Sequence, residues 1–215
     1  LSAGSLTLTG DVKITGNTGA NLYLASGKTV TLDKLGSGAQ IGVTTEDTAV
    51  PVVFAAANGT DYTSRFTPDT ESYSIGYNAS QQLQLQNKTY TVTYAPGANG
   101  TGDSKTVNKE HDKALELQGA LFTRLGYTQV GWSKFDGGER DYSLNAIYEQ
   151  NEPLTLYPVW EERSDYTVHI VNRDGTTLKD FENVKWTDEI WKLLTPKPTR
   201  ENGEILQRLL LGARK

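Results

Sequence analysis

Three acidic side chains crowd one short loop of this chain. Asp136, Glu139 and Asp141 are interrupted only by two glycines and an arginine. Carboxylates at this spacing suit either a calcium loop or the acid pair of a glycoside hydrolase. The loop lacks the alternating oxygen ligands and the closing glutamate of a calcium site, so we expect a solvated hairpin that holds no metal.

The two histidines offer no better catalytic arrangement. His111 and His169 are far apart in the sequence. His169 alternates with Val168 and Ile170, which predicts that it lies on the outer face of a strand. Neither histidine is accompanied by a nucleophile-elbow motif. We therefore expect no catalytic residue, no metal ligand and no cofactor.

Aromatic side chains are the best candidates for binding, because their rings stack on sugars and anchor protein interfaces. Trp186 and Trp191 are five positions apart and cannot share one stripe of a helix, so we expect one of them to stay exposed. Tyr73 and Tyr77 are two further candidates. The predicted binding residues are therefore Trp186, Trp191, Tyr73 and Tyr77.

The chain contains no cysteine, which excludes disulfides, thiol catalysis and thiolate metal sites. Lysine and asparagine are plentiful, for example Lys105 and Asn108, and such side chains can be joined by amide cross-links. The sequence does not place such a cross-link.

Part of the sequence occurs twice in the chain. Tyr90-Thr91-Val92 returns as Tyr166-Thr167-Val168, and at the same offset Thr123-Arg124 returns as Thr199-Arg200. Matches in one register indicate an internal repeat. Nothing in the second copy matches the closing run at 154–160, so we expect that copy to be partial.

Residues 1–88 form a different block. Short apolar pairs alternate with polar residues and are separated by glycine and asparagine. The pairs are Leu6/Leu8, Val12/Ile14, Leu22/Leu24, Val30/Leu32 and Ile41/Val43. Period-two alternation bounded by turn residues predicts short strands. Either a small β-sandwich or the end of a β-helix fits, with residues 60–88 closing the domain.

Two parts of the chain resemble known families. Residues 5–86, with Asn21-Leu22-Tyr23-Leu24 and Gly27-Lys28-Thr29-Val30, resemble the last coils of β-helices in bacterial surface proteins. Residues 89–161 resemble the internalin-type B-repeat in their Tyr90–Tyr94 run, in Gly126-Tyr127 followed by Gly131-Trp132, and in Thr155–Trp160.

The second resemblance implies a β-grasp-like fold, a twisted sheet crossed by one short helix, in a non-catalytic extracellular protein. It places Trp132 and Trp160 at core positions. A second, partial copy at 165–203 follows.

Two segments predict helices, and the tail predicts an open edge. Lys109–Leu121 has strong helical composition, and Val184–Leu194 occupies the same place in the second copy. Residues 204–215 have helical spacing but no evident partner. Because the second copy lacks a closing strand, we expect an uncovered apolar face around Val168, Ile170 and Trp191.

Composition limits the partners. The chain has 215 residues, of which 36% are hydrophobic and 22% charged, so it is globular rather than disordered. Its net charge is −5 with no basic stripe, which argues against nucleic acid. No run is apolar and long enough to span a membrane. The chain opens at Leu1 and lacks methionine, so we expect a segment of a longer protein.

We therefore predict a mainly β, multi-module chain with domains at 1–88, 89–161 and 162–215. The predicted function is that of a non-catalytic segment of an extracellular protein on a bacterial cell surface, which spaces or presents an adhesive region. Its partners would be a host protein or glycan and the neighbouring modules.

Two alternatives stay open. One is an accessory part of a β-helix enzyme that degrades polysaccharide, and the other is a module that binds immunoglobulin. Charged residues converging in one groove would favour the enzyme, and a continuous exposed aromatic patch would favour binding.

Overall fold

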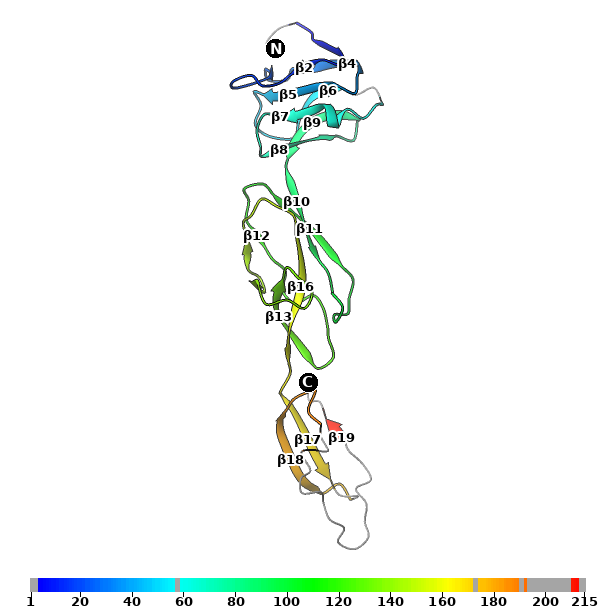
Figure 1. The fold of residues 1–215 in the computed structure, drawn as a ribbon, viewed down its shortest axis with the longest axis vertical. Helices are drawn as coiled ribbons and strands as arrows, with labels where there is room; N and C mark the ends of the chain where they lie inside the picture. The colour runs from blue at the N-terminus through cyan, green and yellow to red at the C-terminus, as the bar shows by residue number, and fades with distance from the viewer. Residues whose placement is uncertain (1–3, 57–58, 172–173, 190–191, 193–209, 213–215) are drawn as a thin grey trace. The chain divides into compact units, whose positions relative to one another are not determined.

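A computed structural model describes residues 4–56, 59–171, 174–189, 192 and 210–212. The fold is mainly β and contains several sheets (Figure 1), as the sequence predicts. Two compact units are present. The first comprises Leu1–Val92, Val107–Leu115 and Ile147–Pro153, and the second comprises Thr93–Thr106, Glu116–Ala146 and Leu154–Lys215. The predicted domain boundaries stay predictions.

The N-terminal part of the first unit consists of short strands and one 3-10 turn. The elements are β1 Thr7–Gly10, β2 Lys13–Ile14, β3 Leu22–Leu24, β4 Val30–Leu35, β5 Gln40–Thr45, β6 Val52–Ala56, η1 Thr63–Arg65, β7 Phe66–Pro68, β8 Tyr73–Tyr77 and β9 Gln82–Asn87. One sheet has the order β1-β4-β6-β9-β8, and a second joins β2, β5 and β3, with β7 also paired to β5.

Most of these strands pair in parallel. Thr31 lies between Thr7 and Ala56, its partners on the two neighbouring strands. In the other sheet Ile41 lies between Ile14 and Phe66 in the same way. The chain therefore returns to each sheet at nearly equal intervals of sequence. The antiparallel strands β9 and β8 then cover the edge of β6.

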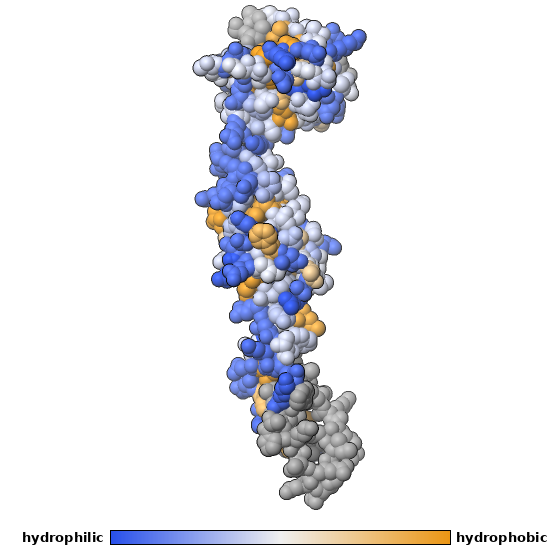
Figure 2. All heavy atoms as spheres, in the orientation of Figure 1, coloured by the Kyte–Doolittle hydropathy of each residue, from blue (hydrophilic) through white to orange (hydrophobic). Residues whose placement is uncertain are grey.

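The predicted apolar pairs supply the core of this unit. Leu22, Leu24, Ile41 and Val43 are buried, and they pack in one cluster with buried side chains of the other sheet. Successive strand residues point to opposite faces, so each pair places both its members inward. On the face drawn in Figure 2, hydrophobic residues form small patches among hydrophilic ones.

A partly buried carboxylate joins three segments of the chain at the edge of this core. Asp69 accepts hydrogen bonds from the backbone N–H of Asn21 (2.9 Å), the amide of Asn21 (2.6 Å) and the hydroxyl of Thr44 (2.8 Å). Burial raises the pKa of Asp69, but the hydrogen bonds from Asn21 and Thr44 outweigh it and hold that pKa below its usual value.

The middle of the chain forms a second five-stranded sheet. Its elements are β10 Thr89–Tyr94, β11 Lys105–Glu110, β13 Tyr127–Ser133, β14 Tyr142–Ser143 and β16 Leu154–Glu162, in the order β11-β10-β16-β13-β14. A separate pair joins β12 Leu115–Glu116 to β15 Ile147–Tyr148.

Trp132 is the central core residue here, as predicted. It is fully buried, its ring centroid lies 4.8 Å from that of Tyr94, and its Nε1–H donates to the carbonyl of Gln118 (2.7 Å). Trp160 is only half-buried, so the prediction of a core position is wrong for this residue. It lies near the end of β16, where it lines a small hollow with Arg124 and Asp136.

The predicted helix at Lys109–Leu121 is wrong. The strand β11 continues to Glu110, and Asp112 then turns the chain with φ 55°. Leu117 is buried, but its N–H bonds to the carbonyl of Ala146 rather than to a preceding turn of its own segment. Hydrogen bonds to partners outside the segment outweigh its helical composition. The short helix implied by the family resemblance is therefore not found in residues 89–161, all of which the structure describes.

The C-terminal strands also correct two expectations. The strands β17 Tyr166–Val171 and β18 Thr177–Val184 pair antiparallel, and β19 Leu210–Gly212 pairs with β17 on its other side. The edge at Thr167–His169 is therefore not open, and Val168 and Ile170 are buried. The predicted helix at Val184–Leu194 is wrong over 184–189, because Val184 ends a strand and a turn follows. Lys192 is helical, and residues 190, 191, 193 and 194 lie outside the described residues.

None of the helices in the described part of the chain has the length and apolar character needed to cross a membrane.

The burial of Trp132 predicts a large loss of stability on truncation. Trp132→Ala should lower the free energy of unfolding by about 3–5 kcal/mol, because the cavity cannot be refilled. Trp160→Ala is the matched control and should cost about 1–2 kcal/mol, since this side chain is only partly buried. Urea titrations followed by circular dichroism measure both, and equal losses would contradict the difference in burial.

The hydrogen bonds of Asp69 predict an acid-sensitive contribution to stability. The carboxyl pKa is lower in the folded than in the unfolded chain, so its stabilisation is present above about pH 4 and is lost as the pH falls through the lowered value. Asp69→Asn should flatten the pH dependence of the melting temperature below about pH 4. Asp33→Asn, at an exposed position of β4, is the control, and an unchanged profile for Asp69→Asn would refute the role of this carboxylate.

Candidate functional site

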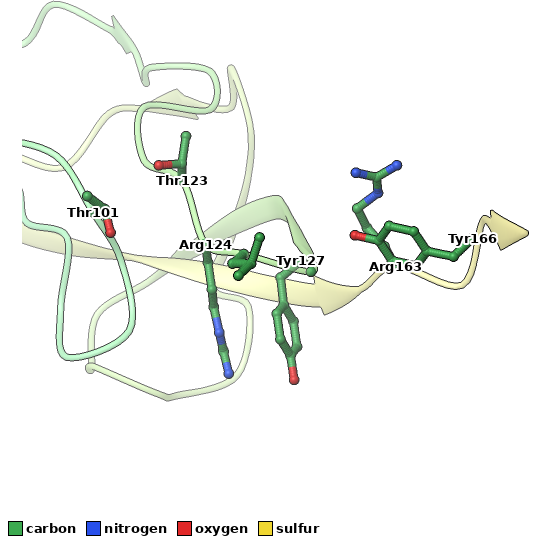
Figure 3. Close-up of a pocket in the computed structure, with 8 residues that line it drawn as sticks. Thr101, Thr123, Arg124, Tyr127, Arg163 and Tyr166 are labelled. Carbon is green, nitrogen blue, oxygen red and sulfur yellow. The ribbon is translucent and has the colours of Figure 1, made fainter. Parts of the chain in front are cut away.

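A hollow of about 430 Å³ lies in the second unit, where aromatic and arginine side chains gather. Its lining consists of Thr101, Thr123, Arg124, Leu125, Gly126, Tyr127, Arg163 and Tyr166. Figure 3 shows Arg124 and Tyr127 projecting on the same side of the loop that leads into β13, and Arg163 beside Tyr166 after the end of β16.

Backbone hydrogen bonds assemble this region. Thr101 and Thr123 exchange N–H to carbonyl bonds of 2.8 and 3.1 Å. The N–H of Arg163 donates to the carbonyl of Gly126 (2.9 Å), and the N–H of Trp186 donates to the carbonyl of Arg163 (3.3 Å). Four segments distant in sequence are thus held side by side.

Each arginine is placed over a tyrosine three positions later. The guanidinium carbon of Arg124 lies 3.7 Å from the ring centroid of Tyr127, and that of Arg163 lies 4.9 Å from the ring of Tyr166. A guanidinium stacked in this way keeps N–H donors free at its edge. Such a pair can hold a carboxylate, sulfate or sugar hydroxyl above an aromatic floor.

The two arginines differ in charge balance. Arg163 donates two hydrogen bonds to Asp165, at 2.9 and 2.7 Å, and this pairing lowers the pKa of the Asp165 carboxyl. Arg124 is absent from the ion pairs found among the described residues. Its charge is therefore the one available to an anionic partner.

Trp186 extends the same surface. Its side chain is 44% exposed, and its ring centroid lies 6.0 Å from that of Tyr166. Glu162 holds the next residue, since it accepts hydrogen bonds from both the N–H and the hydroxyl of Thr187, which lower the pKa of Glu162. Leu125, 75% exposed, lies in the same lining.

Gly126 permits the indole to approach. A Cβ atom on Gly126 would lie 2.1 Å from the Cγ atom of Trp186, and the residue has φ 80°. Both the space and the left-handed backbone therefore require glycine at this position.

The structure places the four predicted binding residues in different surroundings. Trp186 belongs to the hollow's surroundings, and Trp191 lies outside the described residues. Tyr73 and Tyr77 are half-buried against the core of the first unit, where the hydroxyl of Tyr73 donates to Thr48 and that of Tyr77 donates to Thr60. Burial raises the pKa of Tyr77.

Sequence reasoning missed the two arginines and Tyr166. A usable signal existed, because an arginine precedes a tyrosine by three positions at Arg124–Tyr127 and again at Arg163–Tyr166. The contact of Gly126 with Trp186 had no such signal, because it depends on the fold.

Two carboxylates of the acidic loop at 136–141 accept hydrogen bonds from backbone N–H groups. Asp136 accepts the N–H of Ala98 (2.8 Å), and Asp141 accepts the N–H of Lys134 (2.7 Å). In the described part of the chain, no three His, Asp or Glu side chains are grouped so that they could hold a metal ion. His169 lies on the exposed side of β17 beside Asp180, as predicted.

Comparisons with models of protein families, with curated proteins and with solved structures found no match. The resemblances to β-helix coils and to the internalin-type B-repeat therefore stay predictions.

The close approach at Gly126 predicts that Gly126→Ala displaces Trp186. The methyl group would collide with the indole, so the fluorine NMR signal of Trp186 in fluorotryptophan-labelled protein should move toward that of an exposed indole. The signal is assigned by its loss in Trp186→Phe. Gly137→Ala is the control, since Gly137 has φ 74° but nothing within 4 Å of its Cβ position. An unmoved signal in Gly126→Ala would contradict the packing.

Proposed function

We propose that this chain is a non-catalytic segment of an extracellular bacterial surface protein. Its β modules space and present an adhesive region, and the surface around Arg124, Tyr127, Tyr166 and Trp186 contacts a host protein or glycan. We refer to these four residues as the Arg–Tyr–Trp surface.

The Arg–Tyr–Trp surface is the observation that carries the proposal. Tryptophan, tyrosine and arginine are the residues that dominate binding energy at protein interfaces. Here they adjoin one another over a lining that also holds the exposed Leu125. The stacked Arg124 retains donors for an acidic or hydroxyl-rich partner.

The arrangement of strands supports the spacer role. Parallel pairing that recurs at nearly equal intervals of sequence is what the end of a β-helix requires. The neighbours of β10 are β11 and β16, and those of β17 are β18 and β19, so the two repeat copies share one order of strands. Two β-grasp-like modules after a β-helix end fit this pattern. Stacked modules supply reach without a catalytic cleft.

The polysaccharide-degrading alternative is less well supported. Two carboxylates that suited it, Asp136 and Asp141, accept hydrogen bonds from the backbone N–H groups of Ala98 and Lys134. A glycosidase needs two carboxyl groups that face the scissile bond. Capture of immunoglobulin is a separate outcome, which the binding experiment tests directly.

The binding experiment uses the intact chain on a sensor surface against arrays of glycans and purified host glycoproteins, immunoglobulin among them. A ligand of the Arg–Tyr–Trp surface should bind the double variant Arg124→Ala/Trp186→Ala at least about tenfold more weakly, as expected for residues at the centre of an interface. Phe135→Ala is the matched control, because Phe135 is 73% exposed and lies outside the surface.

Equal binding by the double variant and the wild type would refute this surface as the contact. Release of reducing ends from any arrayed polysaccharide would refute the non-catalytic assignment and favour the enzyme.

A further inference from the structure

Lys109 is buried without a carboxylate partner. Its side chain is 1% exposed, and it is absent from the ion pairs of the described residues. Its Nζ atom donates to the carbonyl of Glu110 (3.0 Å) and to Oδ1 of Asn151 (2.9 Å). An ammonium removed from water is costly unless a counter-ion compensates it.

Asn151 is held on every side by the same cluster. Its Oδ1 also accepts the backbone N–H of Asp112 (2.9 Å), and its Nδ2 donates to Oδ1 of Asp112 (2.6 Å). The Nε2 atom of His111 lies 3.4 Å from Nδ2, and the Nδ1 atom of His111 lies 2.8 Å from the hydroxyl of Tyr90. The amide is therefore oriented by groups on both its oxygen and its nitrogen.

Hydrogen bonding alone explains the contacts between Asn151 and Asp112. Asp112 adopts φ 55°, and Asn151 supports that turn by bonding both its N–H and its carboxylate. It does not account for a lysine amine that ends against the amide, away from solvent and from any ion-pair partner. A neutral product at this position would remove the charge that burial penalises.

We propose that Lys109 and Asn151 form an intramolecular amide bond. The uncharged amine of Lys109 attacks Cγ of Asn151 through its lone pair, and the electrons of the C=O bond move to Oδ1. The Cγ–Nδ2 bond then breaks as the C=O bond re-forms. Nδ2 takes up the proton that Nζ loses and leaves as ammonia. The products are a secondary amide and one ammonia, with no oxidant or reductant.

Asp112 supplies two of the groups that this reaction needs. Its backbone N–H faces Oδ1, where negative charge develops, as an oxyanion donor does. Its carboxyl group contacts Nδ2 and can carry the proton from the attacking amine to the departing nitrogen. Burial of the amine keeps Nζ beside the amide of Asn151.

The bond would join Lys109 of β11 to Asn151 in the segment that precedes β16, and both residues belong to the first unit. In a chain without cysteine, it would take the role that a disulfide has elsewhere. The inference is independent of the ligand of the Arg–Tyr–Trp surface.

Intact-mass spectrometry of the purified full chain tests the proposal. The wild type should be lighter than its sequence mass by one ammonia, about 17 Da. Proteolysis should yield a branched peptide that contains both Lys109 and Asn151. Full sequence mass after prolonged incubation at neutral pH would show that the contact is a hydrogen bond only, and would overturn the proposal.

Variants separate this reaction from other losses of ammonia. Lys109→Arg and Asn151→Ala should both restore the full mass, whereas Lys105→Arg, on the same strand, should leave the loss unchanged. Asp112→Asn keeps the backbone N–H and tolerates the left-handed conformation but removes the carboxyl, so it should fold and lose the cross-link. Succinimide formation at Asn58-Gly59, Asn99-Gly100 or Asn202-Gly203 also releases ammonia, and a loss that persists in Lys109→Arg would assign it there and refute the amide bond.

Discussion

The structure depends on the burial of alternate side chains from short strands. In the first unit, parallel strands recur at nearly equal intervals of sequence, and each places its apolar pair toward the same cluster. A shift of one residue in any of these strands would turn the whole pair outward. The register of these strands is therefore specified by the hydrophobic pattern, and the loops between them are free to carry polar side chains.

Polar side chains in turn hold those loops. Asp69 joins Asn21 to Thr44, and Gln129 accepts the N–H groups of Leu121 and Phe122 with one buried oxygen. A buried donor without a partner is costly, so these side chains take the place of ladder hydrogen bonds where the strands end. Asn151 likewise bonds to Asp112 at its turn, and its amide lies within reach of Lys109.

The Arg–Tyr–Trp surface arises where three segments meet around Gly126. The missing side chain of Gly126 admits the indole of Trp186, and the carbonyl of Gly126 bonds to Arg163. Aromatic rings beside cationic donors make a surface that recognises both apolar and polar groups of a partner. The proposed binding role and the proposed cross-link use different residues and different chemistry, so each stands on its own contacts.

Local pattern by itself determined the mainly β fold, the apolar pairs of the first unit and the place of His169 on the outer face of its strand. These features follow from alternation and turn residues, which act within a few positions of one another. Tertiary structure decided the rest. Composition favoured a helix at Lys109–Leu121, but backbone N–H groups of this segment bond to acceptors outside it, as Leu117 bonds to the carbonyl of Ala146.

The strand β19 pairs with the edge of β17, and no match in the sequence indicated that pairing. Trp160 lies near the end of β16 and is only half-buried. The surface around Trp186 and the contact of Lys109 with Asn151 each join residues distant along the chain. Their proximity is a property of the folded path, because no spacing in the sequence encodes which segments will meet.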